Sequence, residues 1–184
     1  MAIAHTRSDD TAPWTVDDLF AMPDDGYRYE IFDGSLIVSP PAAMPHASSV
    51  TRLSRILHAQ LPSDLFAAEG VGVYPNERDY YVPDLVVLTE KMLSSGGPGV
   101  GPADVLLAIE VVSPSNPGND LVLKRAAYAR IGIKHYWIVD RRDSAMRVLE
   151  LDGDAYLEVE TVRPGSAWST TRPFALSLDL GDVF

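Results

Sequence analysis

The sequence predicts a single α/β (or α+β) domain in which a mixed β-sheet is flanked by helices. Short runs of Val, Ile, Leu and aromatic residues bounded by turn residues are typical of buried strands, and apolar residues three or four positions apart are typical of helices. These patterns follow one another as a helix, three strands, a helix and a strand, in the segments 46–61, 65–74, 81–88, 106–112, 119–131 and 135–140. A hairpin signal lies on each side of this series. This order favours a layered domain with one core.

The first elements carry clear boundary signals. Thr15 is a good N-cap for a short helix, which Pro23 ends. Asp33-Gly34 lies between two alternating strands, and this pair is the strongest short signal for a β-hairpin. The helix predicted over 46–61 has one apolar stripe. Its members are Val50, Leu53, Ile56, Leu57 and Leu61.

The pattern in the second half of the sequence predicts a strand–helix–strand unit and a hairpin. The helix over 119–131 closes on Gly132, a residue suited to a left-handed C-terminal cap. It connects the strand 106–112 to the strand 135–140, so we expect these two strands to be parallel and joined by a right-handed crossover. Residues 147–160 form the last predicted hairpin, around an Asp-Gly-Asp turn.

The length and composition favour one domain with a sizeable core. The chain has 184 residues, of which 46% are apolar. We expect residues 1–14 to be a flexible N-terminus and residues 15–184 to be the domain. The segment 94–102 is too rich in Gly and Pro for regular structure. There are no cysteines, which excludes disulfides, zinc–thiolate sites and thiol nucleophiles.

The charge and hydropathy of the chain limit its partners. No apolar run approaches the length needed to cross a bilayer, and the N-terminus lacks the pattern of a signal peptide, so we expect a cytoplasmic protein without a membrane partner. The net charge of −11 is unfavourable for binding nucleic acid, unless a local basic patch compensates. The candidates for such a patch are Lys124, Arg125, Arg130, Lys134, Arg141 and Arg142.

Three charged residues stand among apolar runs. Asp84 and Glu110 lie in the predicted strands 81–88 and 106–112, and Lys124 lies in the helix that follows. A carboxylate in a buried strand must be hydrogen-bonded, paired with a cation or bound to a metal, because burying it alone is very costly. Two such carboxylates and a lysine therefore predict a site for a hard divalent cation.

Several candidate residues also have a purely structural interpretation, although Glu110 is harder to explain in this way because it stands between Ile109 and Val111 in a predicted core strand. Asp84 could begin a strand and accept hydrogen bonds from loop amides. Lys124 could pair with Asp120 one helical turn away, an exposed contact worth roughly 0.3–0.5 kcal/mol. Glu30 could form a cross-strand ion pair, and His46 could be structural at its helix start. For Ser113 and Ser115, turn formation before a helix explains the sequence better than a nucleophilic role.

The ordered set of motifs resembles the PD-(D/E)XK nuclease superfamily, and more closely its Uma-type branch of restriction endonuclease-like proteins. The resemblance runs from about Thr15 to Phe184 and implies a restriction-endonuclease-like αβββαβ core with extra N- and C-terminal hairpins. One departure concerns the motif lysine, because Val112 stands two residues after Glu110 where the superfamily has lysine. The branch implies that Lys124 replaces it. The matching segments are 29–34, 83–87, 110–115, 120–128 and 132–140.

The resemblance implies a metal-dependent phosphodiesterase site. Asp84 and Glu110 would hold Mg²⁺, with Mn²⁺ as the alternative ion, and the Val111 carbonyl would be a third ligand. Lys124 would orient or deprotonate the attacking water, or stabilise the scissile phosphate. Glu30 resembles a further acidic residue of the family that ligates a metal directly or through water. Two more residues fit positions from which they could contact substrate or support the lysine, His46 and Tyr128.

The function implied is a magnesium-dependent endonuclease that hydrolyses DNA and acts as a homodimer, since each subunit of a symmetric dimer could cut one strand. The alternative is a catalytically inactive nuclease-fold module that binds or regulates a partner. The acidic balance and Val112 favour this alternative. A further expectation is that Asp84→Ala leaves the metal-free fold intact or stabilises it, because repulsion between carboxylates is relieved.

Overall fold

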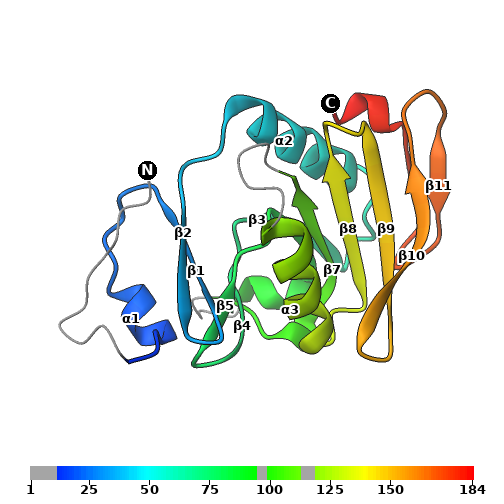
Figure 1. Cartoon of the computed structure of the whole chain (residues 1–184). Coiled ribbons are helices and arrows are strands. Elements are labelled where there is room, and N and C mark those ends of the chain that lie inside the picture. The colour runs from blue at the N-terminus through cyan, green and yellow to red at the C-terminus, as the bar shows by residue number, and fades with distance from the viewer. Residues whose placement is uncertain (1–11, 95–98, 113–118) are drawn as a thin grey trace.

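A six-stranded mixed sheet forms the centre of the molecule (Figure 1). The computed structural model describes residues 12–94, 99–112 and 119–184. In this sheet the strand order is β10-β9-β8-β7-β6-β3, and only the β7–β8 pair is parallel. The strands are β3 (Leu65–Glu69), β6 (Leu85–Thr89), β7 (Val105–Val111), β8 (His135–Asp140), β9 (Ala145–Asp152) and β10 (Ala155–Val162).

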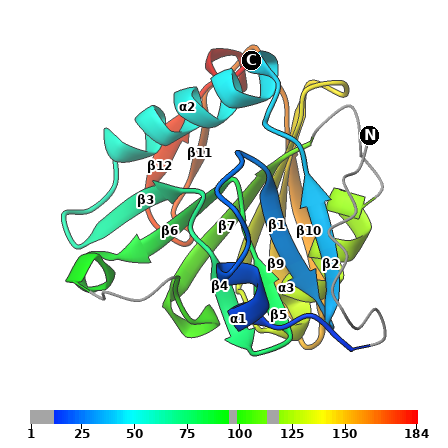
Figure 2. The same cartoon turned by 90° about the vertical axis from the view of Figure 1, so that its left-hand side faces the viewer.

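A second, four-stranded sheet packs beside the first and has the order β2-β1-β5-β4 (Figure 2). It consists of β1 (Arg28–Phe32), β2 (Ser35–Ser39), β4 (Val73–Asn76) and β5 (Asp79–Tyr81). The β1–β2 hairpin turns at Asp33 and Gly34, whose φ angles are 47° and 75°. Both lie in the left-handed region, which Asp tolerates and Gly adopts freely. The Asp-Gly signal therefore predicted the turn correctly.

Helices cover both faces of the six-stranded sheet. On one face, α2 (Met44–His58) buries Leu53 and Leu57 against Leu107 and Ile109 of β7. On the other face lies α3 (Arg125–Arg130), which packs with Ala108 of β7. Successive strand residues point to opposite faces, so β7 contributes to both cores.

The remaining elements are short. Helix α1 (Val16–Phe20) has the predicted Thr15 cap, with Asp18 completing a capping box. Trp14 donates from its amide to the Gly34 carbonyl and packs against the α1 side of the small sheet. The others are β11 (Trp168–Thr170), β12 (Leu176–Leu178), a π-helical segment at Asn119–Lys124, and 3₁₀ turns at Glu90–Ser94, Pro102–Asp104 and Leu180–Asp182.

The predicted αβββαβ core is confirmed as α2-β3-β6-β7-α3-β8. The predicted strand 135–140 and the parallel pairing across the second helix are also confirmed. In the part of the chain described here, no helix combines the length and apolar character required to span a membrane. Three predictions fall at least partly outside the described residues: flexibility of 1–14, irregularity of 94–102, and turn formation at Ser113 and Ser115.

Other predictions need correction. The described strands form three sheets in place of the single predicted sheet, and the β4–β5 and β11–β12 pairs were not predicted. The helix expected from residue 46 begins at Met44, because Pro45 is tolerated in a first helical turn, where its missing N–H costs nothing. The helix expected over 119–131 begins with the π-helical segment before α3. Such segments occur mainly as local irregularities and are frequent at functional sites.

Candidate active site

The register of β6 and β7 brings the two central carboxylates side by side. The pairs Val86–Ala108 and Leu85–Ile109 run antiparallel, and one further step along both strands aligns Asp84 with Glu110. Both residues are buried. This proximity comes from the pairing of the two strands, whose acidic residues are 26 positions apart in the sequence.

The amide of Val111 donates to Asp84 Oδ2 at 2.8 Å, so the neighbouring strand fixes this carboxylate directly. The structural alternative for Asp84, acceptance of hydrogen bonds from loop amides, is therefore replaced by a contact with β7. The Val111 carbonyl as a metal ligand remains a prediction.

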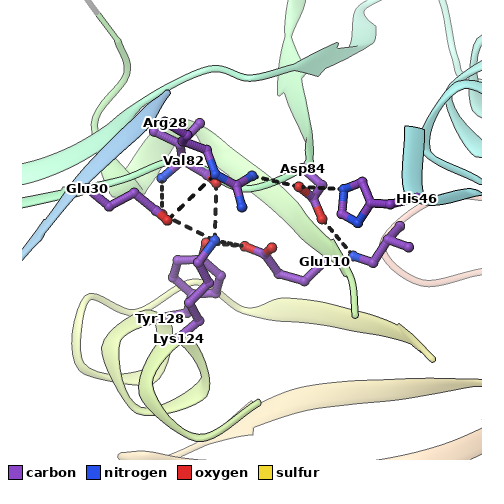
Figure 3. Close-up of polar contacts among 9 residues, drawn as sticks. Arg28, Glu30, His46, Val82, Asp84, Glu110, Lys124 and Tyr128 are labelled. Atoms are coloured by element: carbon purple, nitrogen blue, oxygen red, sulfur yellow. Dashed lines mark hydrogen bonds and ion pairs between the residues drawn. The ribbon is translucent and has the colours of Figure 1, made fainter. Parts of the chain in front are cut away.

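Lys124 reaches the carboxylates from the end of the π-helical segment (Figure 3). Ala108 lies on the α3 side of the sheet, and Glu110, two residues on, faces the same way. The Lys124 Nζ atom lies 2.8 Å from Glu110 Oε1, 3.2 Å from Glu30 Oε1 and 3.2 Å from the Val82 carbonyl oxygen. An ammonium group has three donors, which these three acceptors can engage. Lys124 therefore lies between the carboxylates of Glu30 and Glu110.

Glu30 belongs to the same cluster although it comes from the smaller sheet. Its Oε1 accepts a hydrogen bond of 2.8 Å from the Val82 amide. Val82 follows β5, which pairs with β1, and leads through Pro83 to Asp84, directly before β6. The site thus lies where the two sheets meet, and an ion pair with Lys124 accounts for the buried Glu30 side chain.

Arg28 is a member of the cluster that the sequence analysis missed. Its Nη1 lies 2.7 Å from Asp84 Oδ1, and its Nε lies 3.8 Å from Glu30 Oε2. The available signal was the spacing in β1, because residues 28 and 30 alternate with buried Tyr29 and share one face of the strand. That spacing does not reveal which strand lies opposite.

His46 and Tyr128 complete the cluster from the two helices. His46 Nε2 lies 3.2 Å from Asp84 Oδ1, which brings the first turn of α2 to the site. The Tyr128 hydroxyl donates to Glu110 Oε1 at 2.6 Å, and the residue is fully buried. Tyr128 thus contacts a carboxylate, and its side chain is not exposed to solvent where a substrate could bind. A substrate contact by His46 remains a prediction.

The positive groups strongly favour the ionised form of Asp84. Burial alone would raise the pKa of this carboxyl, but the hydrogen bond from His46 and the charges of Arg28 and Lys124 lower the pKa well below its ordinary value. The negative charge of Asp84 is therefore balanced by the neighbouring positive groups and hydrogen-bond donors. The expectation that its removal relieves repulsion in the metal-free protein is not supported, because its neighbours in contact are positive or N–H donors.

Glu110 behaves differently from Asp84. Burial raises the pKa of Glu110 to about 8, against the opposing effect of the nearby Lys124 charge. Burial also acts to lower the pKa of Lys124, but the negative charges of Glu110 and Glu30 outweigh it and raise the pKa above its ordinary value. The cluster therefore holds a protonated lysine, and burial shifts Glu110 toward its protonated form.

The predicted basic patch does not form one free surface. Lys124 is buried in the cluster, Arg125 donates to the Tyr156 carbonyl, and Arg130 pairs with Asp79 at 2.9 Å. Arg142 likewise pairs with Asp140 at 2.9 Å. Of the remaining two candidates, Lys134 is exposed, and Arg141 donates to the Ser49 hydroxyl.

Similarity to known proteins identifies the family of the chain. The family model Uma2, described as "Putative restriction endonuclease", matches residues 16–181. The chain belongs to the Uma2 family. The resemblance inferred from the motifs is therefore confirmed, and the match covers nearly all of the predicted domain. No curated protein matches the chain significantly.

The fold of this Uma2 protein is similar to that of a "putative nuclease" of the DUF820 group from Anabaena variabilis. The TM-score is 0.74 at 17% sequence identity, and the alignment covers 94% of this chain and 98% of the other. The predicted restriction-endonuclease-like fold class is thereby confirmed.

The donor chemistry of the cluster suits Mg²⁺, although the carboxylates are not arranged as a ready metal site. Mg²⁺ prefers oxygen ligands and is commonly held by one or two carboxylates plus waters and substrate phosphates. Asp84 and Glu110 on adjacent strands meet that requirement. Among the residues described, no three acidic or histidine side chains are grouped so that they could hold a metal ion. In this Uma2 protein the guanidinium of Arg28 contacts Asp84, and the ammonium of Lys124 contacts Glu110.

The raised pKa of Glu110 predicts a pH effect on stability. Between the ordinary pKa of 4.5 and the folded-state pKa of about 8, folded Glu110 keeps a proton that the unfolded chain releases. The contribution of Glu110 to the free energy of unfolding should therefore fall as the pH rises through this range. Glu110→Gln mimics the protonated form, so its stability relative to wild type should increase with pH.

Urea denaturation at several pH values, without metal, measures this difference. Glu160→Gln is the matched control, because Glu160 is exposed on β10. Its stability relative to wild type should stay constant over the range. Parallel pH curves for wild type and Glu110→Gln would contradict the raised pKa.

Proposed function

We propose that this Uma2 protein is a divalent-metal-dependent endonuclease that hydrolyses phosphodiester bonds in DNA, with Mg²⁺ or Mn²⁺ as its cofactor. The observation that supports this most strongly is the buried cluster of Asp84, Glu110 and Lys124 at the junction of the two sheets. A merely structural core would gain little from three charged groups here, because replacing a buried ion network by apolar residues is often neutral or stabilising.

Asp84 and Glu110 are the proposed metal ligands, with Glu30 and the Val111 carbonyl as further candidates. A bound Mg²⁺ would neutralise charge on the scissile phosphate and activate a water. The Tyr128 hydroxyl of α3 donates a hydrogen bond to Glu110 Oε1, and the Val111 amide donates one to Asp84 Oδ2. These contacts fix the two carboxylates before any ligand arrives, and such preorganisation is a main source of catalytic power.

Lys124 is proposed to act through its charge. The raised pKa of Lys124 keeps the ammonium protonated at neutral pH, so it is a poor acceptor for a proton from water. Of the roles predicted from the sequence, orientation of the attacking water and stabilisation of the phosphate fit this state. Deprotonation of the water does not fit it.

The proposal includes a cytoplasmic homodimer, in which each subunit cuts one strand of a duplex. The C-terminal hairpin offers an edge for such an assembly, because β10 is the outer strand of the large sheet and carries exposed Leu157 and Val159. Since the net charge of −11 repels DNA, we expect DNA binding to depend on divalent metal.

The test is cleavage of supercoiled and linear DNA by the purified protein with Mg²⁺, with Mn²⁺ or with chelator. Asp84→Asn protein prepared in the same way controls for a contaminating nuclease. The proposal predicts cutting by wild type with metal, and none with chelator or with the variant. Equal cutting by wild type and Asp84→Asn would contradict it.

The alternative is a nuclease-fold module that binds a partner without chemistry. Two observations favour it: Val112 is buried where the superfamily has its motif lysine, and Arg28 already pairs with Asp84. Metal binding separates the two proposals. An inactive module has no need for metal affinity at Asp84, whereas the nuclease requires it even when the tested DNA is not a substrate.

A further inference from the structure

Arg28 lies at the solvent side of the charged cluster. Its side chain is 32% exposed, whereas those of Lys124 and Asp84 are 2% and 4% exposed and that of His46 is 11% exposed. A ligand arriving from solvent therefore meets the Arg28 guanidinium before it meets the carboxylates.

Arg28 neutralises the carboxylate that the proposed function assigns to the metal. Its Nη1 contacts Asp84 Oδ1 at 2.7 Å, and His46 contacts the same oxygen at 3.2 Å. Asp84 Oδ2 accepts from the Val111 amide. A divalent cation at Asp84 would be repelled by the guanidinium and would compete with it for the same negative charge.

A phosphate group could replace the Asp84 carboxylate as the partner of the Arg28 guanidinium. Arginine binds phosphate oxygens as it binds carboxylate oxygens, through paired N–H donors, and it stays charged under all conditions that the protein meets. A phosphodiester bound from solvent beside Arg28 would offer such oxygens to its partly exposed side chain.

We infer that Arg28 exchanges partners: it holds Asp84 in the metal-free protein, and its guanidinium passes to a phosphate of the bound nucleic acid when a divalent cation binds Asp84. This inference rests on the proposed function. It adds that Arg28 and the metal oppose each other in the absence of DNA, and that metal and DNA favour each other through Arg28.

The first test is calorimetric titration of Mg²⁺ and Mn²⁺ into the full-length protein without DNA. Arg28→Gln should bind metal more tightly than wild type, by on the order of tenfold, which is a usual strength of coupling between two competing interactions. Arg28→Lys keeps the positive charge and should bind metal much as wild type does. The matched control is Arg172→Gln, which breaks an exposed pair with Glu150.

The second test is binding of a labelled DNA duplex, in Ca²⁺ to limit cleavage and in chelator. Arg28→Gln should weaken DNA binding in Ca²⁺ and leave it almost unchanged in chelator, where Arg28 of the wild type stays with Asp84. Arg172→Gln should have the same small effect in both conditions. Circular dichroism confirms that each variant is folded.

The outcomes separate the inference from the proposed function. If wild type binds metal and Arg28→Gln binds it no more tightly, the exchange is overturned and the nuclease proposal stands. An equal loss of DNA affinity in Ca²⁺ and in chelator would make Arg28 an ordinary DNA contact, which also overturns the exchange. If neither wild type nor Arg28→Gln binds metal, the proposed function fails and the inference fails with it.

Discussion

Asp84→Asn is expected to weaken Mg²⁺ binding by on the order of a hundredfold or more and to reduce DNA cleavage to the level seen with chelator. The amide keeps the size of the carboxylate and an oxygen that can accept the Val111 amide, so the local backbone should persist. It lacks the negative charge that a magnesium ion needs. Titration calorimetry and a single-turnover cleavage assay measure the two effects.

The same substitution should destabilise the metal-free protein by about 1–3 kcal/mol, because Arg28 and His46 lose a charged partner. Asp140→Asn is a suitable control, since Asp140 is also a buried carboxylate paired with an arginine, Arg142. It should lower stability and leave metal affinity unchanged. Normal metal affinity in Asp84→Asn would remove this residue from the proposed site.

Lys124→Met is expected to cost about 3–5 kcal/mol in the free energy of unfolding, which is the usual effect of removing one partner from a buried ion pair. Methionine fills much of the same volume, so the loss reports the missing charge. Glu30 and Glu110 would remain buried without the ammonium between them. Urea denaturation at neutral pH measures the change.

Two comparisons identify the cause of that loss. Lys134→Met changes an exposed lysine and should alter stability by less than about 0.5 kcal/mol. Adding Glu30→Gln to Lys124→Met should recover part of the loss, because a neutral amide is cheaper to bury than an unpaired carboxylate. Equal stabilities for Lys124→Met and Lys134→Met would mean that the ion pairs of Lys124 contribute nothing.

Much of the fold was predictable because its signals are local. The Asp33-Gly34 turn, the Thr15 cap and the strand at 135–140 each depend on a few neighbouring residues, and each is confirmed. The helix predicted over 119–131 lies where it was expected, but its first six residues are π-helical. Residue spacing indicates that a segment is helical, but it does not reveal a π-helical start whose last residue is Lys124.

The parts that were missed depend on contacts between distant segments. The separate four-stranded sheet arises because β1 pairs with β5, some 50 residues later, and β5 itself is only three residues long. Arg28 joins the site for the same reason, since its partner Asp84 comes from another sheet. Asp84, Glu110 and Lys124 could be singled out because a charge in an apolar segment is visible without knowing the partner.

The most direct test of the account is a crystal structure of the wild-type protein with Mn²⁺, in which anomalous scattering locates the ion. We expect an anomalous peak in contact with the carboxylates of Asp84 and Glu110, with the Arg28 guanidinium no longer bound to Asp84. Mn²⁺ elsewhere in the crystal, with no peak at these carboxylates and the Arg28–Asp84 pair intact, would contradict it.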